Sequence, residues 1–89
     1  MAWFVYLLRC ADDSLYTGVT VDLQRRLQEH NHDNRKGARY TRGRRPVIMV
    51  YNESLSGRSQ ALKREIAIKK LSRSAKEALI ATQHTEQEL

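Results

Sequence analysis

Apolar and polar positions divide the chain into short runs, and the first two runs have the pattern of β-strands. Residues 3–10 are rich in β-branched, aromatic and leucine residues, and residues 15–19 form a second run of the same kind. Because the polar stretch Ala-Asp-Asp-Ser at 11–14 separates them, the two runs predict an antiparallel hairpin. Gly18 interrupts the second run near its end, where a glycine permits either a bulge or the close approach of another group to the backbone.

Helical spacing follows the predicted hairpin, and a third strand-like run comes after it. Leu23 and Leu27 define the apolar stripe of a helix over residues 23–30, with Thr20 or Asp22 as its N-cap and the polar stretch 31–34 as its end. The basic segment up to Pro46 is predicted to be a loop. Residues 47–51 form a near-continuous apolar run, which is typical of a central strand buried on both faces.

Two more helices are predicted in the C-terminal part. Apolar residues recur at helical spacing between 59 and 72, namely Ala61, Leu62, Ile66, Ile68 and Leu71. Ser74 and Glu77 have the spacing of a capping box that begins a last short helix, and residues from 83 onward are polar. The sequence therefore predicts one α+β domain over residues 1–82 in the order β-β-α-β-α-α, followed by a polar tail over 83–89.

Length and cysteine content indicate a single domain in a reducing compartment. Eighty-nine residues suffice for one hydrophobic core but not for two. Cys10 is the only cysteine, so no intrachain disulfide can form, and its apolar neighbours indicate a buried thiol. The apolar N-terminal run is too short to span a membrane. We expect a cytoplasmic protein that is a monomer by default and has no membrane partner.

The charge favours a polyanionic partner, because 16 Lys and Arg outnumber 10 Asp and Glu and leave a formal charge of +6. Six of these cations lie in the segment RKGARYTRGRR at 35–45, which contains one tyrosine and no acid. A solvated basic loop is the alternative interpretation. As a nucleic-acid contact, the segment offers phosphate-binding cations and a ring that can stack on a base. The candidates are Arg35, Lys36, Arg39, Tyr40, Arg42, Arg44 and Arg45.

Three ionisable residues fall on apolar helix faces. Arg26 and His30 lie on or beside the stripe of the first helix, and Glu65 lies near the middle of the apolar arc of the second long helix. Arg26 can extend along the edge of the core, and His30 can be a hydrogen-bonded core histidine. Glu65 can pair with Lys69 one turn later. A metal ligand is the sharper interpretation of Glu65, because burying a bare carboxylate costs several kcal/mol.

Two tyrosines complete a candidate site. Tyr6 and Tyr16 lie on the two strands of the predicted hairpin, and each alone has the pattern of a core aromatic. The five residues nevertheless lie on elements that must pack together. As a set they meet the needs of phosphodiester hydrolysis, because they supply two phenols, an arginine, a histidine and a carboxylate. That reaction requires a base for water, a cation for the charge on phosphate and often a metal held by a carboxylate.

These residues occur in an order that resembles a known family. Phe4-Val5-Tyr6, then Tyr16-Thr17-Gly18, then Arg26, His30 and Glu65 resemble the ordered motifs of the GIY-YIG nuclease superfamily over about residues 2 to 80. Phe4 and Thr17 stand where the family carries glycine and isoleucine, and neither change removes a side chain that does chemistry. The resemblance is closest to the short bacterial members that consist of little else than this domain.

The resemblance implies a fold, a site and a reaction. It implies a three-stranded antiparallel sheet between helices, with Tyr6, Tyr16, Arg26, His30 and Glu65 on one face. Glu65 would bind Mg²⁺ or Mn²⁺, Tyr6 would be the general base with the help of His30, Tyr16 would position water or phosphate, and Arg26 would hold the phosphate. The implied activity is endonucleolytic cleavage of nucleic acid, DNA ahead of RNA. The alternative is a weakly active or inactive nucleic-acid-binding module, or an adaptor in a DNA repair or mobile-element complex.

Overall fold

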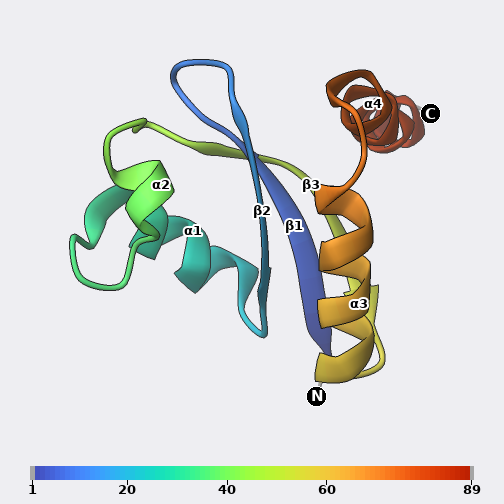
Figure 1. Ribbon diagram of the computed structural model, residues 1–89, viewed down its shortest axis with the longest axis horizontal. Coiled ribbons are helices and arrows are strands. Elements are labelled where there is room, and N and C mark those ends of the chain that lie inside the picture. The colour runs from blue at the N-terminus through green and yellow to red at the C-terminus, as the bar shows by residue number, and fades with distance from the viewer. Residues whose placement is uncertain (1, 89) are drawn as a thin grey trace.

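The computed structural model describes residues 2–88, with side chains through residue 83, and it confirms the predicted α+β fold. Strands β1 (Trp3–Arg9) and β2 (Leu15–Thr20) precede helices α1 (Leu23–His32) and α2 (Arg39–Arg42); strand β3 (Ile48–Leu55) is followed by helices α3 (Arg58–Lys69) and α4 (Arg73–Glu88). Figure 1 shows α1 and α2 on one side of the sheet and α3 and α4 on the other. Apart from the added short helix α2, the order of elements is the predicted one.

The three strands form an antiparallel sheet in the order β2-β1-β3. The prediction that the 47–51 run is a central strand was wrong, because β1 occupies the centre and β3 lies at an edge. Ile48 is 58% exposed for this reason. Both strands flanking β1 cover its backbone groups, which is why the residues from Val5 to Leu8 are fully buried.

Side chains of β1 alternate between two cores, one on each face of the sheet. Val5 and Leu7 pack with Tyr51, Ile68 and Ile80 on the α3 and α4 face. Tyr6, Leu8 and Cys10 pack with Val47 on the α1 face, where Leu23 and Leu27 cover them. The alternation follows from the two-residue period of a strand. It places Tyr6 on the same face as α1, and it confirms the buried thiol of Cys10.

Helix α1 begins as the sequence predicted and ends two residues later. Asp22 is the N-cap, with its carboxylate accepting from the backbone N–H of Arg25 at 3.0 Å. Thr20, the alternative cap, accepts from the backbone N–H of Asp22 instead. The predicted loop before Pro46 contains the four-residue helix α2, which the basic composition of the segment concealed.

The C-terminal part departs from the prediction in three ways. Ile66 is 53% exposed on α3 although it shares the helical spacing of the buried Ala61 and Ile68. Ala75 N–H bonds to the hydroxyl of Ser72, and Glu77 bonds to arginines, so the predicted capping box at Ser74 is absent. Helix α4 also extends to Glu88, through the segment expected to be a polar tail.

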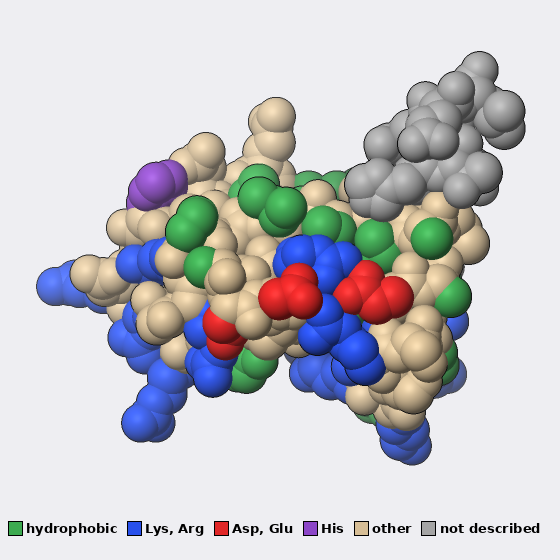
Figure 2. Space-filling model, turned by 90° about the horizontal axis from the view of Figure 1, so that it is seen from above, with side chains coloured by type: hydrophobic (Ala, Val, Ile, Leu, Met, Phe, Trp, Pro, Cys, Tyr) green, Lys and Arg blue, Asp and Glu red, His purple; other side chains and the backbone are tan. Residues whose placement is uncertain are grey.

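Contacts with arginines and with β3 fix α4 to the sheet. Glu77 accepts from both terminal nitrogens of Arg9 on β1, at 2.9 and 2.6 Å, and the side chain of Gln83 bonds to the backbone of Asn52. Figure 2 shows acidic and basic side chains close together near the middle of one face, and Lys and Arg side chains projecting from the end that carries α1 and α2. No helix in the described part of the chain is both long and apolar enough to cross a membrane.

Candidate active site

The centre of the candidate site is the phenol of Tyr6, which lies over the backbone of Gly18. The two residues are direct partners in the β1–β2 ladder, which has no bulge at this point. A Cβ added at Gly18 would stand 2.6 Å from Cζ of Tyr6 and would also strike its hydroxyl. The sequence allowed two roles for Gly18, a bulge or the close approach of another group to its backbone. The structure shows the close approach. Only the absence of a side chain lets the phenol occupy this position.

The hydroxyl of Tyr6 bonds to a buried histidine. Oη of Tyr6 lies 2.8 Å from Nε2 of His30 on α1, and Nδ1 of His30 lies 2.9 Å from Oγ1 of Thr41 on α2. His30 and Thr41 are both 0% exposed, and Tyr6 is 1% exposed. The hydrogen-bonded chain from β1 through α1 to α2 thus connects three elements through groups shielded from solvent.

Tyr16 contacts the other side of this cluster. Its ring meets the ring of His30 edge to face, with centroids 5.2 Å apart, and stacks on the ring of Tyr40 at 5.9 Å. The guanidinium of Arg44 lies 4.0 Å above the ring of Tyr40 and bonds to the carboxylate of Asp12 in the hairpin turn. Tyr40 was a candidate for stacking on a base. In the structure the guanidinium of Arg44 already lies over this ring. A base can therefore stack only on the part of the ring that Arg44 leaves uncovered.

Arg26 is held at the edge of the site. Its Nη1 donates to a carboxylate oxygen of Glu29 at 2.9 Å and to the carbonyl of Lys36 at 2.6 Å. The side chain is 23% exposed, so the guanidinium is partly open to solvent. Its charge acts on both Tyr6 and His30, where it lowers the pKa of each. The guanidinium is therefore next to the phenol and in reach of an anion from solvent.

Burial keeps the phenol of Tyr6 and the imidazole of His30 neutral near pH 7. Burial raises the pKa of Tyr6 to about 12; Arg26 opposes this rise, while Tyr16 and Glu65 add to it. Burial also lowers the pKa of His30 to about 4, with Arg26 and Arg45 lowering it further and Glu29 opposing. A phenol that retains its proton and a neutral imidazole, which has one unprotonated nitrogen, are suited to form a donor–acceptor pair.

Glu65 projects from α3, the helix on the opposite side of the sheet from α1, and its charge helps to raise the pKa of Tyr6. Its side chain is 17% exposed, and one oxygen lies 3.6 Å from Nζ of Lys69, which is itself largely exposed. The i,i+4 pair considered from sequence therefore forms. It is weak, because Lys69 is solvated and the distance is long. The carboxylate of Glu65 is thus not held by a strong ion pair.

A divalent ion at Glu65 would have few protein ligands. Within residues 2–83 no three His, Cys, Asp or Glu side chains lie together in a way that could hold a metal. Mg²⁺ keeps several waters and often takes one or two carboxylates plus phosphate oxygens. The single, partly exposed carboxylate of Glu65 fits that kind of ion, and it does not fit an ion that needs a closed cage of protein ligands.

The basic segment 35–45 divides into two groups. Arg45 donates to the carbonyls of His30 and Asp33 and to the side chain of Asn34; Arg42 and Arg44 likewise bond to carbonyls of the fold. The segment itself contains no acid, but the hairpin turn brings the carboxylate of Asp12 to Arg44. In the described part of the chain, three cations of the segment have side chains without a hydrogen bond or ion pair. We call them the unpaired cations: Arg35, Lys36 and Arg39.

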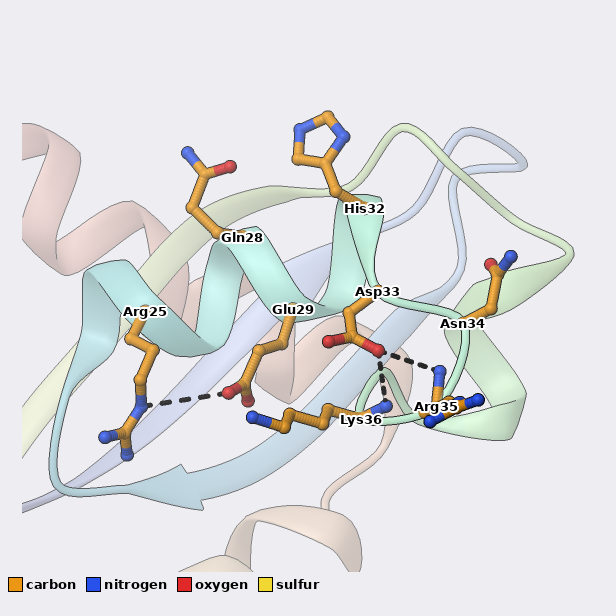
Figure 3. A pocket seen from close by; sticks show the side chains of 8 residues that line it. All are labelled: Arg25, Gln28, Glu29, His32, Asp33, Asn34, Arg35 and Lys36. Atoms are coloured by element: carbon orange, nitrogen blue, oxygen red, sulfur yellow. Dashed lines mark hydrogen bonds and ion pairs between the residues drawn. The ribbon is translucent and has the colours of Figure 1, made fainter.

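An open hollow lies on the outer side of α1, next to Arg26. Figure 3 shows Arg25 and Glu29 pointing toward each other there, while the carboxylate of Asp33 accepts from the backbone N–H groups of Arg35 and Lys36. Glu29 contacts Arg26 as well as Arg25. The hollow does not contain Tyr6 or His30, and it extends the charged surface away from the hydrogen-bonded cluster. Its lining consists of Arg25, Gln28, Glu29, His32, Asp33, Asn34, Arg35 and Lys36.

Sequence reasoning missed two residues that the site depends on. Thr41 is the partner of His30, yet it lies inside a basic stretch with no apolar periodicity that would mark it as buried. Arg45 was grouped with the surface cations, although its Nε is 2.6 Å from the carbonyl of His30. The one available signal was that Thr41 is the only β-branched residue in the segment 35–45.

The sequence matches a family model, curated proteins and solved structures over most of its length. The GIY-YIG catalytic domain model matches residues 2–78. A UPF0213 protein of Desulfotalea psychrophila is 57% identical over 79 residues, which are 89% of this chain and 71% of that protein. A UPF0213 protein of Halobacterium salinarum is 52% identical over 75 residues, which are 84% of this chain and 95% of that protein.

Two solution NMR structures have the same fold. A UPF0213 protein from Bacillus halodurans is 41% identical, with a TM-score of 0.58 over 92% of this chain and 85% of that one. A protein from E. faecalis is 46% identical, with a TM-score of 0.64 over 96% of this chain and 88% of that one. All five candidate site residues lie inside the 2–78 match.

Proposed function

Because the chain belongs to the family of GIY-YIG catalytic domains, we propose that it is an endonuclease that hydrolyses phosphodiester bonds of nucleic acid, DNA rather than RNA, with a divalent metal ion. The observation that carries this proposal is the arrangement around Tyr6. The buried phenol of Tyr6 is hydrogen-bonded to a neutral histidine, the partly exposed Arg26 lies beside the phenol, and the charge of Glu65 acts on it from α3. Base, phosphate-binding cation and metal ligand are the three functions that the reaction needs.

The proton of the attacking water would pass to Tyr6. As the water oxygen forms its bond to phosphorus, Oη of Tyr6 takes the water proton and gives its own proton to Nε2 of His30 across the 2.8 Å hydrogen bond. This relay avoids a free phenolate, which a pKa of about 12 would make costly at neutral pH. The P–O ester bond opposite the water breaks, and the leaving oxygen acquires a proton from solvent.

Arg26 would hold the phosphate, and the bound phosphate would make His30 a better proton acceptor. Its positive charge lowers the pKa of His30 in the free protein. A phosphate bound to the guanidinium would bring negative charge that offsets this influence, so the imidazole would accept a proton more readily when substrate is present. Tyr16, packed against the ring of His30, would form the wall that orients the water.

Glu65 would hold the divalent ion, and Mg²⁺ or Mn²⁺ is the ion that its oxygen ligand suits. When bound, the ion would supply positive charge that stabilises the phosphate and the leaving oxygen. The Glu65–Lys69 contact of 3.6 Å is weak enough to be given up when the ion binds.

The second candidate function is a nucleic-acid-binding module without turnover. The raised pKa of Tyr6 and the single carboxylate favour this candidate, because both lower the expected rate of hydrolysis. The unpaired cations would bind phosphates in either case, and the module could act as an adaptor in a larger DNA repair assembly. Binding that weakens with salt, in the absence of metal-dependent cleavage, would support the module.

The test compares cleavage by the wild-type protein and two matched variants. Purified protein is incubated with branched, flapped, single-stranded and duplex DNA and with RNA, in Mg²⁺, in Mn²⁺ and in chelator. We expect metal-dependent cleavage that Tyr6→Phe abolishes and Tyr51→Phe retains. Tyr51 is the control because it is a buried strand tyrosine on the opposite face of the sheet. Equal cleavage by both variants would remove Tyr6 from the mechanism, and absence of cleavage on every substrate would leave the binding module.

A further inference from the structure

A chain of buried polar groups extends from Tyr6 beyond His30 and ends on α2. Tyr6 Oη and His30 Nε2 are 2.8 Å apart, His30 Nδ1 and Thr41 Oγ1 are 2.9 Å apart, and Thr41 Oγ1 and the carbonyl oxygen of Ala38 are 3.0 Å apart. In the described part of the protein, no buried side-chain nitrogen or oxygen lacks a hydrogen-bond partner. The proton positions in this chain can therefore be worked out from the donors and acceptors.

The hydrogen atoms can be assigned in one direction. The buried phenol of Tyr6 keeps its proton and must donate it to an acceptor. Nε2 of His30 is the acceptor that the structure provides, since the nearby guanidinium of Arg26 can only donate. Nε2 therefore carries no hydrogen, so Nδ1 carries it and donates to Thr41. The hydroxyl of Thr41 in turn donates to the carbonyl of Ala38.

The reverse assignment leaves the buried phenol hydrogen of Tyr6 without an acceptor in the described part of the chain. If the hydroxyl of Thr41 donated to Nδ1, the neutral ring would carry its hydrogen on Nε2 and donate to Oη of Tyr6. The phenol hydrogen would then have no acceptor among the described residues, which costs about 1–3 kcal/mol for a buried group. Thr41 thus selects the tautomer by offering Nδ1 an acceptor.

We propose that Thr41 is a positioning residue of the active site, which holds neutral His30 as the Nδ1–H tautomer and so leaves Nε2 free to accept the phenol proton of Tyr6. The inference rests on the proposed function, because a fixed tautomer matters only if a proton moves from Tyr6 to His30. Thr41 itself touches neither substrate nor metal in this role.

The hydroxyl of Thr41 is dispensable for the fold of α2. The carbonyl of Ala38 also accepts from the backbone N–H groups of Thr41 at 3.1 Å and of Arg42 at 3.2 Å. The helix turn therefore stays closed without the hydroxyl. Thr41→Val replaces the hydroxyl with a methyl group of similar volume, so the variant is expected to retain α2 and to lose the acceptor for Nδ1.

The first measurement reads the tautomer directly and requires no activity. The two imidazole nitrogens of His30 are observed by ¹⁵N NMR at pH 7, in wild type, Thr41→Val and Thr41→Ser. We expect a protonated Nδ1 and an unprotonated Nε2 in wild type and in Thr41→Ser, and a mixture of tautomers or the Nε2–H form in Thr41→Val. An Nε2–H tautomer in the wild-type protein, or an unchanged spectrum in Thr41→Val, would overturn the proposal.

The second measurement asks whether the tautomer affects the reaction. In Thr41→Val we expect kcat to fall between about tenfold and hundredfold, a part of the 10² to 10⁴ that a positioned base contributes, with KM unchanged. Thr41→Ser should restore kcat. Thr82→Val is the matched control, because the hydroxyl of Thr82 makes the same bond to a carbonyl three residues earlier but lies on the exposed face of α4.

The two measurements separate the two proposals. Wild-type cleavage with a normal kcat in Thr41→Val would refute the positioning role and leave the nuclease intact. A wild-type protein that cleaves no substrate would refute the nuclease, and the ¹⁵N spectrum would still show whether Thr41 sets the tautomer of His30.

Discussion

Replacing Gly18 with alanine is the most direct test of how the fold places the phenol of Tyr6. The added Cβ would stand 2.6 Å from Cζ of Tyr6, whereas carbon atoms in contact prefer about 3.5–4.0 Å. The ring must therefore move by roughly 1 Å. Because the two residues are direct partners in the β1–β2 ladder, the backbone cannot relieve the contact without loss of strand hydrogen bonds.

The displacement has two energetic consequences. Overpacking of a well-packed core costs about 1–3 kcal/mol. A shift of about 1 Å also stretches the 2.8 Å bond between Tyr6 and His30 beyond the range of a hydrogen bond, which costs about 1 kcal/mol more. The sum of about 2–4 kcal/mol corresponds to a fall in Tm of roughly 8–32 °C for a domain of this size. Cleavage should fall with it at temperatures where the variant is folded.

Thermal unfolding and cleavage are measured on the same preparations, with Gly43→Ala as the control. A Cβ at Gly43 meets nothing within 4 Å, and its φ of −90° is accessible to alanine. The control should match or slightly exceed wild-type stability. In a Tyr6→Phe background the Gly18→Ala penalty should shrink, since one of the two contacts is gone. A Gly18→Ala variant with wild-type Tm and cleavage would refute the close-approach explanation of this glycine.

Three further changes probe the metal ligand, the basic surface and acid stability. Glu65→Gln should reduce metal-dependent cleavage by orders of magnitude while Tm stays within a few degrees, because its pair with Lys69 is weak; wild-type turnover would exclude Glu65 as the metal ligand. Replacing all three unpaired cations with alanine should leave Tm unchanged and make the slope of log K against log salt for duplex DNA binding less steep. If each cation contacts one phosphate, the slope should change by up to about 2.7. Arg45→Ala should instead lower Tm, because it removes donors from the carbonyl of His30 and its neighbours. Hydrogen bonds from Arg9 and Arg73 hold the pKa of Glu77 at about 2, below its ordinary value of 4.5. That stabilisation is present above pH 4.5 and is lost as the pH falls toward 2, so a Glu77→Gln variant should show a flatter plot of Tm against pH in this window.

The same structure explains why part of the basic segment is unsuitable for a binding test. Arg44 and Arg45 are bonded to the hairpin turn and to the end of α1, so their removal would change binding and stability together. The unpaired cations have no such contacts in the described part of the chain. A loss of affinity at those positions can be interpreted as a loss of phosphate contacts.

Local patterns in the sequence determined the helices and strands and the kinds of side chain at the candidate site. The period of the apolar residues predicted the hairpin, three of the four helices and the faces of α1, because strand and helix periods are set by backbone geometry within a few residues. The ordered tyrosine, arginine, histidine and glutamate residues predicted the family, which the match over residues 2–78 confirms. For Gly18 the sequence reduced the explanations to two, and one of them is correct.

Only the tertiary structure decided how these elements are combined. An apolar run does not reveal whether its strand is central or at an edge, and pairing with β1 placed β3 at the edge. Likewise, the spacing of eleven residues between His30 and Thr41 does not predict their hydrogen bond, which depends on how α2 packs against α1. The lowered pKa of His30 follows from burial of its imidazole, which the packing of α1 and α2 against the sheet produces. These features arise from contacts between residues distant in sequence, whose free energies depend on the packing of the whole domain and leave no periodic trace in any one segment.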